Sequence, residues 1–137
     1  MNLIELYDTV GAVSLGRPNV NSYHPKSPYI ALQEREVPYS AMCFTVEGIR
    51  DDEEYRVFEC NLYYADRLQQ DGSNWIEIQN DAYLTLYSVI DELREAEGIS
   101  GIETTSQLQF FYQRLTDYCA GAWITIEIII PIDFCNE

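Results

Sequence analysis

The sequence is poor in the side chains that most catalytic and nucleic-acid-binding sites need. It has a single histidine, and only 8 Lys and Arg stand against 23 Asp and Glu in 137 residues, a formal net charge of −15. A face that binds DNA neutralises phosphates with Lys and Arg. The charge balance therefore argues against a protein that binds nucleic acids or anionic membranes.

Phosphate-binding loops and paired metal-binding cysteines are also missing. Neither GxGxxG nor GxxxxGK[ST] occurs, and no CxxC pair is present. We therefore expect no zinc site, no thioredoxin-like motif and no cofactor. The four cysteines are expected to be reduced thiols that act as small hydrophobic residues, and pairing in an oxidising compartment is the alternative. They are Cys43, Cys60, Cys119 and Cys135.

No run of hydrophobic residues is long enough to cross a membrane. The longest, 122–132, is interrupted by Thr125 and Glu127, and a span needs roughly 18–20 apolar residues. The first residues lack the basic and apolar regions of a secretory signal. We expect a protein made in the cytoplasm that does not contact a membrane.

The length and the 47% of hydrophobic residues fit a single domain covering 1–137. Apolar residues at helical spacing predict a helix over 3–13. Residues 16–38 hold four of the five prolines without a sustained period, which predicts an extended arm or loop. Such a segment is usually functional or packed on something else, and here we expect a neighbouring subunit.

Alternating residues predict four strands around a second helix. Strands over 39–49 and 55–65 form a hairpin, a capping box of Asn74 and Glu77 opens a helix over 74–97, and strands over 103–117 and 121–132 follow. The expected order is α-β-β-α-β-β. The fold class is α+β: an antiparallel sheet of two long hairpins with helices packed on one face.

Catalytic constellations are hard to assemble from this sequence. His24 is the only imidazole and lies between Tyr23 and Pro25, and no serine has a GxSxG context. The acidic run at the tip of the first hairpin lacks the spacing of a calcium loop and is interpreted as a solvated turn. The strand faces predicted to point inward, 58–62 and 124–128, carry no acid at their inward positions. We therefore expect no enzyme.

Aromatic residues are more abundant than one small core needs. Eleven tyrosines and two tryptophans occur, and they fall on both faces of the predicted strands. Tyr, Trp and Arg are enriched at protein interfaces. An ordinary aromatic core with tyrosine hydroxyls at its rim is the alternative. The candidate interface residues are Arg17, Tyr23, His24, Tyr29, Tyr63, Phe111 and Trp123.

The last third of the chain carries a recognisable pattern. Residues 110–127, FFYQRLTDYCAGAWITIE, and 130–135, IPIDFC, combine an aromatic-rich strand, a polar turn with Ala-Gly, a β-rich strand and a Pro/Asp/Cys ending. This pattern resembles small neck or tail proteins of tailed bacteriophages that infect gut Bacteroidetes, including the crAss-like group. The order of the elements is also similar to that of tail-terminator and tail-completion proteins.

The resemblance implies a virion structural protein without an active site. Such a protein forms a homo-oligomeric ring of six or twelve copies in the neck or tail, connects the portal or adaptor to the tail, and contacts other neck and tail proteins. An acidic lumen repels DNA phosphates, so Asp51, Asp52, Glu53 and Glu54 are candidates for lining the DNA channel. The alternative is an acidic DNA-mimic or inhibitory protein that occupies a basic site on another protein.

Overall fold

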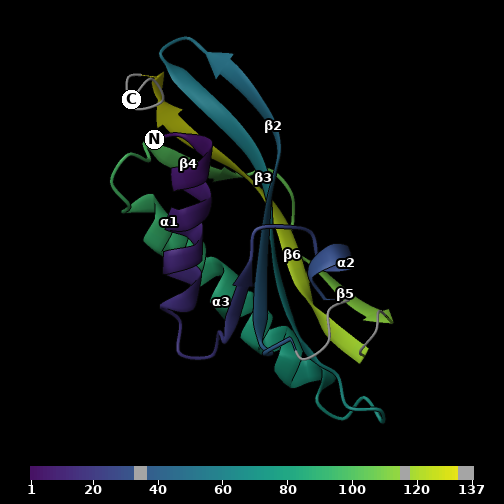
Figure 1. The fold of residues 1–137 in the computed structure, drawn as a ribbon. Helices are drawn as coiled ribbons and strands as arrows, with labels where there is room; N and C mark the ends of the chain where they lie inside the picture. The colour runs from purple at the N-terminus through teal and green to yellow at the C-terminus, as the bar shows by residue number, and fades with distance from the viewer. Residues whose placement is uncertain (33–36, 115–117, 133–137) are drawn as a thin grey trace.

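The structure, a computed structural model, describes residues 1–32, 37–114 and 118–132. Within these ranges the chain has a mixed α+β fold with a six-stranded sheet and three helices, which confirms the predicted class. The helices are α1 (Leu3–Leu15), α2 (Pro28–Ala31) and α3 (Trp75–Arg94). Figure 1 shows an elongated molecule in which α1 and α3 lie on one side of the long strands.

The strands pair mostly antiparallel. Their order in the sheet is β1-β2-β3-β6-β4, and β5 also pairs with β6. The pairing of β1 with β2 is parallel and the others are antiparallel. The strands are β1 (Ser22–His24), β2 (Ala41–Asp52), β3 (Tyr55–Arg67), β4 (Gly101–Thr104), β5 (Gln109–Arg114) and β6 (Tyr118–Pro131).

The first hairpin, β2 and β3, contains a bulge on β2. The register shifts between Val46 and Gly48, so Glu47 has no residue opposite it on β3. The backbone N–H of Val46 donates to the hydroxyl of Tyr7 on α1, at 3.0 Å. The Tyr7 hydroxyl therefore accepts the hydrogen bond of this N–H, which would otherwise have no acceptor at the bulge.

The strand predicted over 103–117 is interrupted, and the expectation of one continuous strand was wrong. Its two parts, β4 and β5, follow one another along β6. Between them the N–H of Thr125 donates to the hydroxyl of Ser106, at 3.1 Å, where a regular ladder has a carbonyl. The end of the predicted strand, 115–117, lies outside the described residues. Residues 118–120, expected in the turn, belong to β6.

The capping box predicted at Asn74 does not form. Asn74 is the N-cap residue of α3, but its side chain makes no capping hydrogen bond. Instead its Oδ1 accepts from the N–H of Gln69 at 2.8 Å and its Nδ2 donates to the carbonyl of Arg67 at 2.9 Å. The side chain closes the preceding loop, and this use of the amide replaces the cap.

The segment expected to be an extended arm, 16–38, folds onto its own chain. It contributes β1 at the edge of the sheet, and α2 packs on the sheet face opposite α1 and α3. There Ala31 and Leu32 join a small cluster with Cys43 and Cys119. The sequence had predicted that the helices pack on one face of the sheet. In the structure α1 and α3 do so, whereas α2 packs on the opposite face. Residues 33–36 lie outside the described part.

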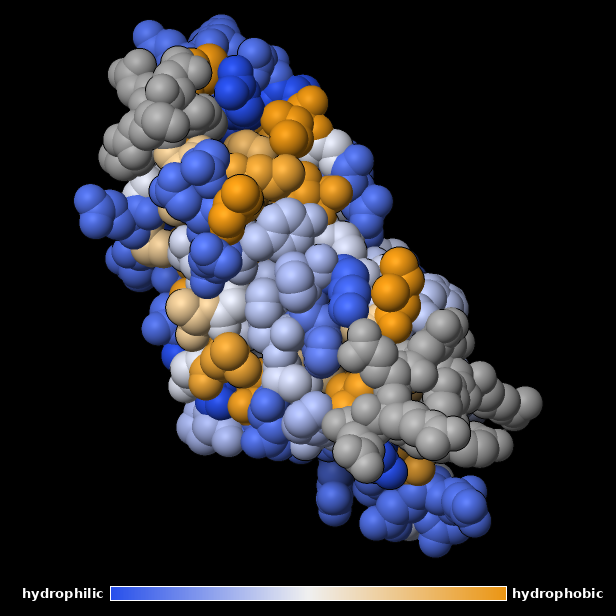
Figure 2. All heavy atoms as spheres, in the orientation of Figure 1, coloured by the Kyte–Doolittle hydropathy of each residue, from blue (hydrophilic) through white to orange (hydrophobic). Residues whose placement is uncertain are grey.

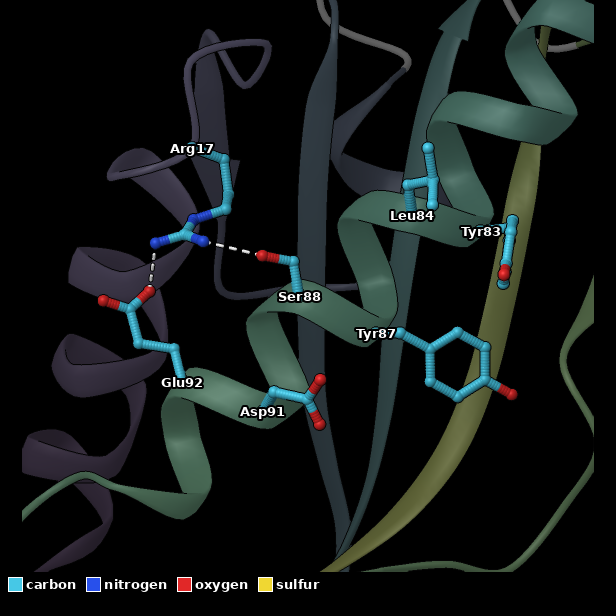
Figure 3. A pocket seen from close by; sticks show the side chains of 7 residues that line it. All are labelled: Arg17, Tyr83, Leu84, Tyr87, Ser88, Asp91 and Glu92. Atoms are coloured by element: carbon cyan, nitrogen blue, oxygen red, sulfur yellow. Dashed lines mark hydrogen bonds and ion pairs between the residues drawn. The ribbon is translucent and has the colours of Figure 1, made fainter.

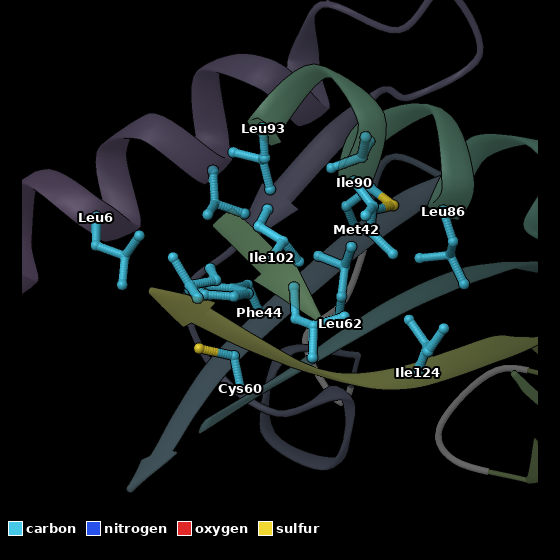
Figure 4. Packing of buried hydrophobic residues seen from close by; sticks show 14 of the residues in the cluster. Leu6, Met42, Phe44, Cys60, Leu62, Leu86, Ile90, Leu93, Ile102 and Ile124 are labelled. Carbon is cyan, nitrogen blue, oxygen red and sulfur yellow. The ribbon is translucent and has the colours of Figure 1, made fainter. Parts of the chain in front are cut away.

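The main core lies between the sheet and the two longer helices (Figure 4). Leu6 of α1 and Leu86, Ile90 and Leu93 of α3 are completely buried against the inward side chains of the strands. The predicted inward residues are buried there as expected. They are Phe58, Cys60, Leu62, Ile124, Ile126 and Ile128, none more than 3% exposed.

Candidate functional site

The outward face of the sheet carries an aromatic pair next to the α2 cluster. The rings of Tyr63 on β3 and Trp123 on β6 stack with centroids 6.2 Å apart, and both are half-buried. Phe111 on β5 packs at the edge of the α2 cluster. The structure therefore brings three of the candidate interface residues to one face of the sheet.

Glutamates form a row across the same face, beyond the aromatic pair. The register places Glu59 of β3 opposite Glu127 of β6, and Glu127 opposite Glu103 of β4. Like charges directly opposite one another destabilise a sheet. Arg50 forms an ion pair with Glu127, and this contact, with Asp52 and Glu59 nearby, raises the pKa of Arg50.

The acidic run lies at the tip of the first hairpin, and its four residues are exposed. Asp51 and Asp52 end β2, and Glu53 and Glu54 make the turn, in which Glu53 has a φ of 56°. Arg56 donates to the carboxylate of Asp51 at 2.6 Å, and this hydrogen bond lowers the pKa of Asp51. The run is brought together at one end of the molecule, apart from the Tyr63–Trp123 pair.

The candidate interface residues of the 16–38 segment differ in how far they are buried by contacts within the chain. The ring of Tyr23 packs against Gly11 and its hydroxyl donates to the carbonyl of Tyr7 at 2.9 Å. Burial raises the pKa of Tyr23. His24 contacts the Ser22 hydroxyl at 3.0 Å. Tyr29 on α2 is 58% exposed, as is its neighbour Ile30 at 61%.

Arg17 lies at the side of α3 and helps to line an open hollow there (Figure 3). Its guanidinium donates to the hydroxyl of Ser88 at 2.6 Å and forms an ion pair with Glu92. The α3 hollow is lined by Arg17, Tyr83, Leu84, Tyr87, Ser88, Asp91 and Glu92. In Figure 3 Arg17 reaches over from the α1 side, and Tyr83 and Tyr87 lie on the other side of the helix.

The apolar part of this hollow was missed at the level of the sequence. Tyr83 is 49% exposed, and the centroid of its ring lies 5.8 Å from that of Tyr87. Leu84 is 53% exposed. Ile76, Tyr83 and Tyr87 recur at helical spacing, which is a second stripe beside the buried one. A helix with two apolar stripes has more apolar surface than one core contact covers.

A second group of exposed aromatic side chains lies at the start of α3. The ring of Trp75 makes edge contacts with Tyr112 and Phe110 of β5, at 5.2 and 6.3 Å. Tyr112 and Phe110 are 57% and 45% exposed, although their partners in the register of β6, Ala120 and Ala122, are completely buried. Trp75 contacts both rings, which nevertheless remain partly in solvent.

Three of the four cysteines lie within the described residues. Cys43 and Cys60 are buried free thiols, Cys119 is buried as well, and Cys135 lies outside the described residues. Within 1–32, 37–114 and 118–132, no group of three or more His, Cys, Asp or Glu side chains is arranged to hold a metal ion. None of the helices in these ranges combines the length and apolarity needed to cross a membrane.

The face of the molecule shown in Figure 2 is mixed rather than dominated by one apolar patch. In Figure 2 the lower end of the molecule is hydrophilic, and hydrophobic residues reach the surface in several separate groups.

Comparison with known proteins gives no assignment, because no protein-family model and no curated protein sequence matches the chain. Any functional argument therefore depends on the surfaces described above.

Proposed function

We propose that this protein is a structural subunit that forms an oligomeric ring in the neck or tail of a tailed bacteriophage. In this role it connects the portal or adaptor to the tail, with other neck and tail proteins as partners and no catalysis of its own. The observation that carries the proposal is a pair of unlike, partly apolar surfaces on opposite sides of one sheet: α2 with the Tyr63–Trp123 face on one side, and the α3 hollow on the other.

Unlike surfaces on opposite sides are what a ring subunit needs. A ring closes through head-to-tail contacts, in which one surface of each copy meets a different surface of the next. A twofold dimer would instead use one self-complementary surface. The exposed side chains of α2 and of α3 differ in sequence and charge, which favours the head-to-tail arrangement.

The acidic hairpin tip supports the same role. Asp51, Asp52, Glu53 and Glu54 are exposed together at one end of the molecule. In a ring, tips that point to the centre would repel the phosphates of DNA passing through, so the genome would not adhere. Replacing Asp52, Glu53 and Glu54 by their amides is expected to leave the ring intact and to increase its retention of DNA at low salt.

The native mass of the purified protein tests the proposal. Light scattering coupled to size exclusion, at several concentrations, is combined with class averages from electron microscopy. A closed ring of six or twelve copies with a central hole supports the proposal. A monomer at every concentration that is also absent from intact virions overturns it and favours the acidic inhibitor of a nucleic-acid-binding protein.

A further inference from the structure

We infer that the outward face of the sheet, between α2 and the hairpin tip, docks a basic extended segment of a different protein. This surface, here called the outward platform, joins the stacked rings of Tyr63 and Trp123 to the glutamate row, Glu59, Glu127 and Glu103. The inference deepens the proposed function, because it gives the chemistry of one partner of the ring subunit. It rests on that function only for the place of the partner in the neck or tail.

The helices of the described residues pack elsewhere on the sheet. Both α1 and α3 cover the inward face, and α2 packs at the end of the strands away from the hairpin tip, over Ala41 and Ala65 (Figure 1). On the strip between α2 and the tip, Trp123 is half-buried, and Glu59 and Glu103 are exposed. The outward platform is therefore a sheet face that a partner can reach.

The spacing of the platform suits an extended chain. Trp123 and Glu127 lie four residues apart on β6, about 13 Å at the rise of a strand. Side chains at positions i and i+4 of an extended segment point to the same side and are separated by the same distance. One basic side chain of such a segment would lie over the Trp123 ring, as a cation–π contact, while another reaches the glutamates.

Like charges face one another on the platform, which is unfavourable for the unbound protein. Glu127 lies directly opposite both Glu59 and Glu103, and like charges at such positions destabilise a sheet. Arg50 pairs with Glu127, whose side chain is only 16% exposed. Three carboxylates and one guanidinium leave two negative charges, next to the exposed Glu59 and Glu103. A bound cation relieves this repulsion, so the platform favours a basic ligand over a neutral or acidic one.

Hydrogen bonds hold the polar side chains between the aromatic pair and the glutamates in place. The hydroxyl of Thr125 donates to Asn61 Oδ1 at 2.8 Å, and Asn61 Nδ2 lies 3.5 Å from Glu47 Oε1. The hydroxyl of Thr45 donates to the same oxygen of Glu47 at 2.7 Å. These bonds link β2, β3 and β6 across the platform. The carboxylate of Glu47 is thereby oriented before any ligand binds, so little ordering is needed on docking.

The sequence shows that a second copy of the chain is a poor source of this segment. Each copy carries a net charge of −15, and its 8 Lys and Arg are scattered. The two that lie nearest in the sequence are Arg50 and Arg56, and the acids at 51–54 separate them. Nucleic acid is repelled by the same charge. The segment therefore comes from a different protein, and α2 remains available to the neighbouring copy.

A model peptide of alternating Arg and Thr, about eight residues long, tests the platform, because its arginines share one side when it is extended. Binding of the fluorescein-labelled peptide is measured by anisotropy at low salt. The double variant Glu59→Gln, Glu103→Gln is expected to bind at least about tenfold more weakly than wild type. The control is Glu95→Gln, Glu97→Gln, which makes the same change of charge at exposed residues beyond the end of α3. It is expected to bind within about twofold of wild type.

Two further measurements locate the peptide and exclude misfolding. Trp75→Phe leaves Trp123 as the one tryptophan of the chain, and unlabelled peptide is expected to change its emission with the midpoint found by anisotropy. The Glu59→Gln, Glu103→Gln variant is expected to have a higher urea midpoint than wild type, because opposed carboxylates are removed. A wild type that does not bind the peptide, equal weakening in both double variants, or constant Trp123 emission at saturation overturns the inference.

The outcomes separate this inference from the proposed function. Light scattering on the same proteins measures ring formation. Rings whose peptide binding is absent, or equally weakened in both double variants, would keep the function and reject the platform. Selective binding at the platform by a protein that is monomeric at every concentration and absent from virions would keep the platform and reject the ring. Failure of both measurements would reject both.

Discussion

Gly121 gives the sharpest prediction about the fold, because the backbone of the neighbouring strand leaves no room for a side chain there. Gly121 on β6 lies opposite Ala65 on β3. A Cβ atom added at Gly121 would lie 1.7 Å from the carbonyl oxygen of Tyr64 and 2.7 Å from its carbonyl carbon. These are backbone atoms, so rotation of a side chain cannot relieve the contact. Gly121→Ala therefore forces β3 and β6 apart.

The cost follows from the distance that must be gained. Bringing the 1.7 Å contact to an ordinary separation of about 3.2 Å lengthens the neighbouring ladder hydrogen bonds beyond their useful range. Two such bonds cost about 1 kcal/mol each, and loosened packing around the buried Tyr64 adds about 1–3 kcal/mol. We expect a loss of about 3–5 kcal/mol, a large part of the 5–15 kcal/mol typical of a domain.

Urea unfolding monitored by circular dichroism measures this loss. Gly48→Ala and Gly101→Ala are matched controls, because a Cβ at either position has no neighbour within 4 Å. Both controls are expected to stay within about 0.5 kcal/mol of wild type, as surface substitutions usually do. A Gly121→Ala variant that unfolds within about 1 kcal/mol of wild type would show that the strands are not as close as the structure places them.

The other predictions concern hydrogen bonding, surface charge and alkaline pH. Tyr7→Phe removes the acceptor for the N–H of Val46 and is expected to cost about 1–2 kcal/mol in the same urea assay. Arg50→Ala removes the cation that pairs with Glu127 in the glutamate row, so the urea midpoint is expected to fall at low salt and to recover at high salt. Adding Glu103→Gln to the Arg50→Ala variant is expected to restore part of the loss. Equal midpoints of Arg50→Ala and wild type at low salt would contradict this reasoning. Burial raises the pKa of Cys43 from about 9 to about 12. The unfolded state then loses this proton at lower pH than the folded state, so stability is expected to fall as pH rises from 9 to 12, and the fall should be shallower in Cys43→Ala.

The elements that could be predicted from the sequence are those whose signal is local. The helix expected over 3–13 forms as Leu3–Leu15, and the alternation around the acidic run forms the β2–β3 hairpin. Burial of Ile124, Ile126 and Ile128 follows directly from alternation on a strand covered on one side. In each case the apolar residues repeat with the period of the element, so neighbours in the sequence are sufficient to identify it.

The predictions from sequence failed where a residue forms its hydrogen bond or packing contact with a part of the chain outside the predicted element. Asn74 has the sequence context of a helix cap, but its side chain bonds the loop that precedes it. Ser106 accepts a hydrogen bond from Thr125 on another strand and so interrupts the expected strand. The prolines of 16–38 indicated an extended arm, but a small apolar cluster on the outward face holds α2 against the sheet.

The interaction surfaces show the same division. The sequence indicated a surplus of aromatic residues and an acidic hairpin tip, because both are properties of composition and of adjacent residues. It did not indicate that Tyr83, Leu84 and Tyr87 would be exposed together, since a stripe on a helix has no direction until the helix is packed.

By itself, the sequence determined the acidic charge, the mixed α+β class and the inward faces of the main strands, because periodicity and composition depend on residues near one another in the chain. The tertiary structure alone decided which apolar surplus is buried and which reaches solvent. That choice depends on how each helix packs on the sheet. The buried side of α3 covers the middle strands, and its exposed side forms the hollow beside Arg17. The short helix α2 is held on the opposite face, with Tyr29 and Ile30 exposed.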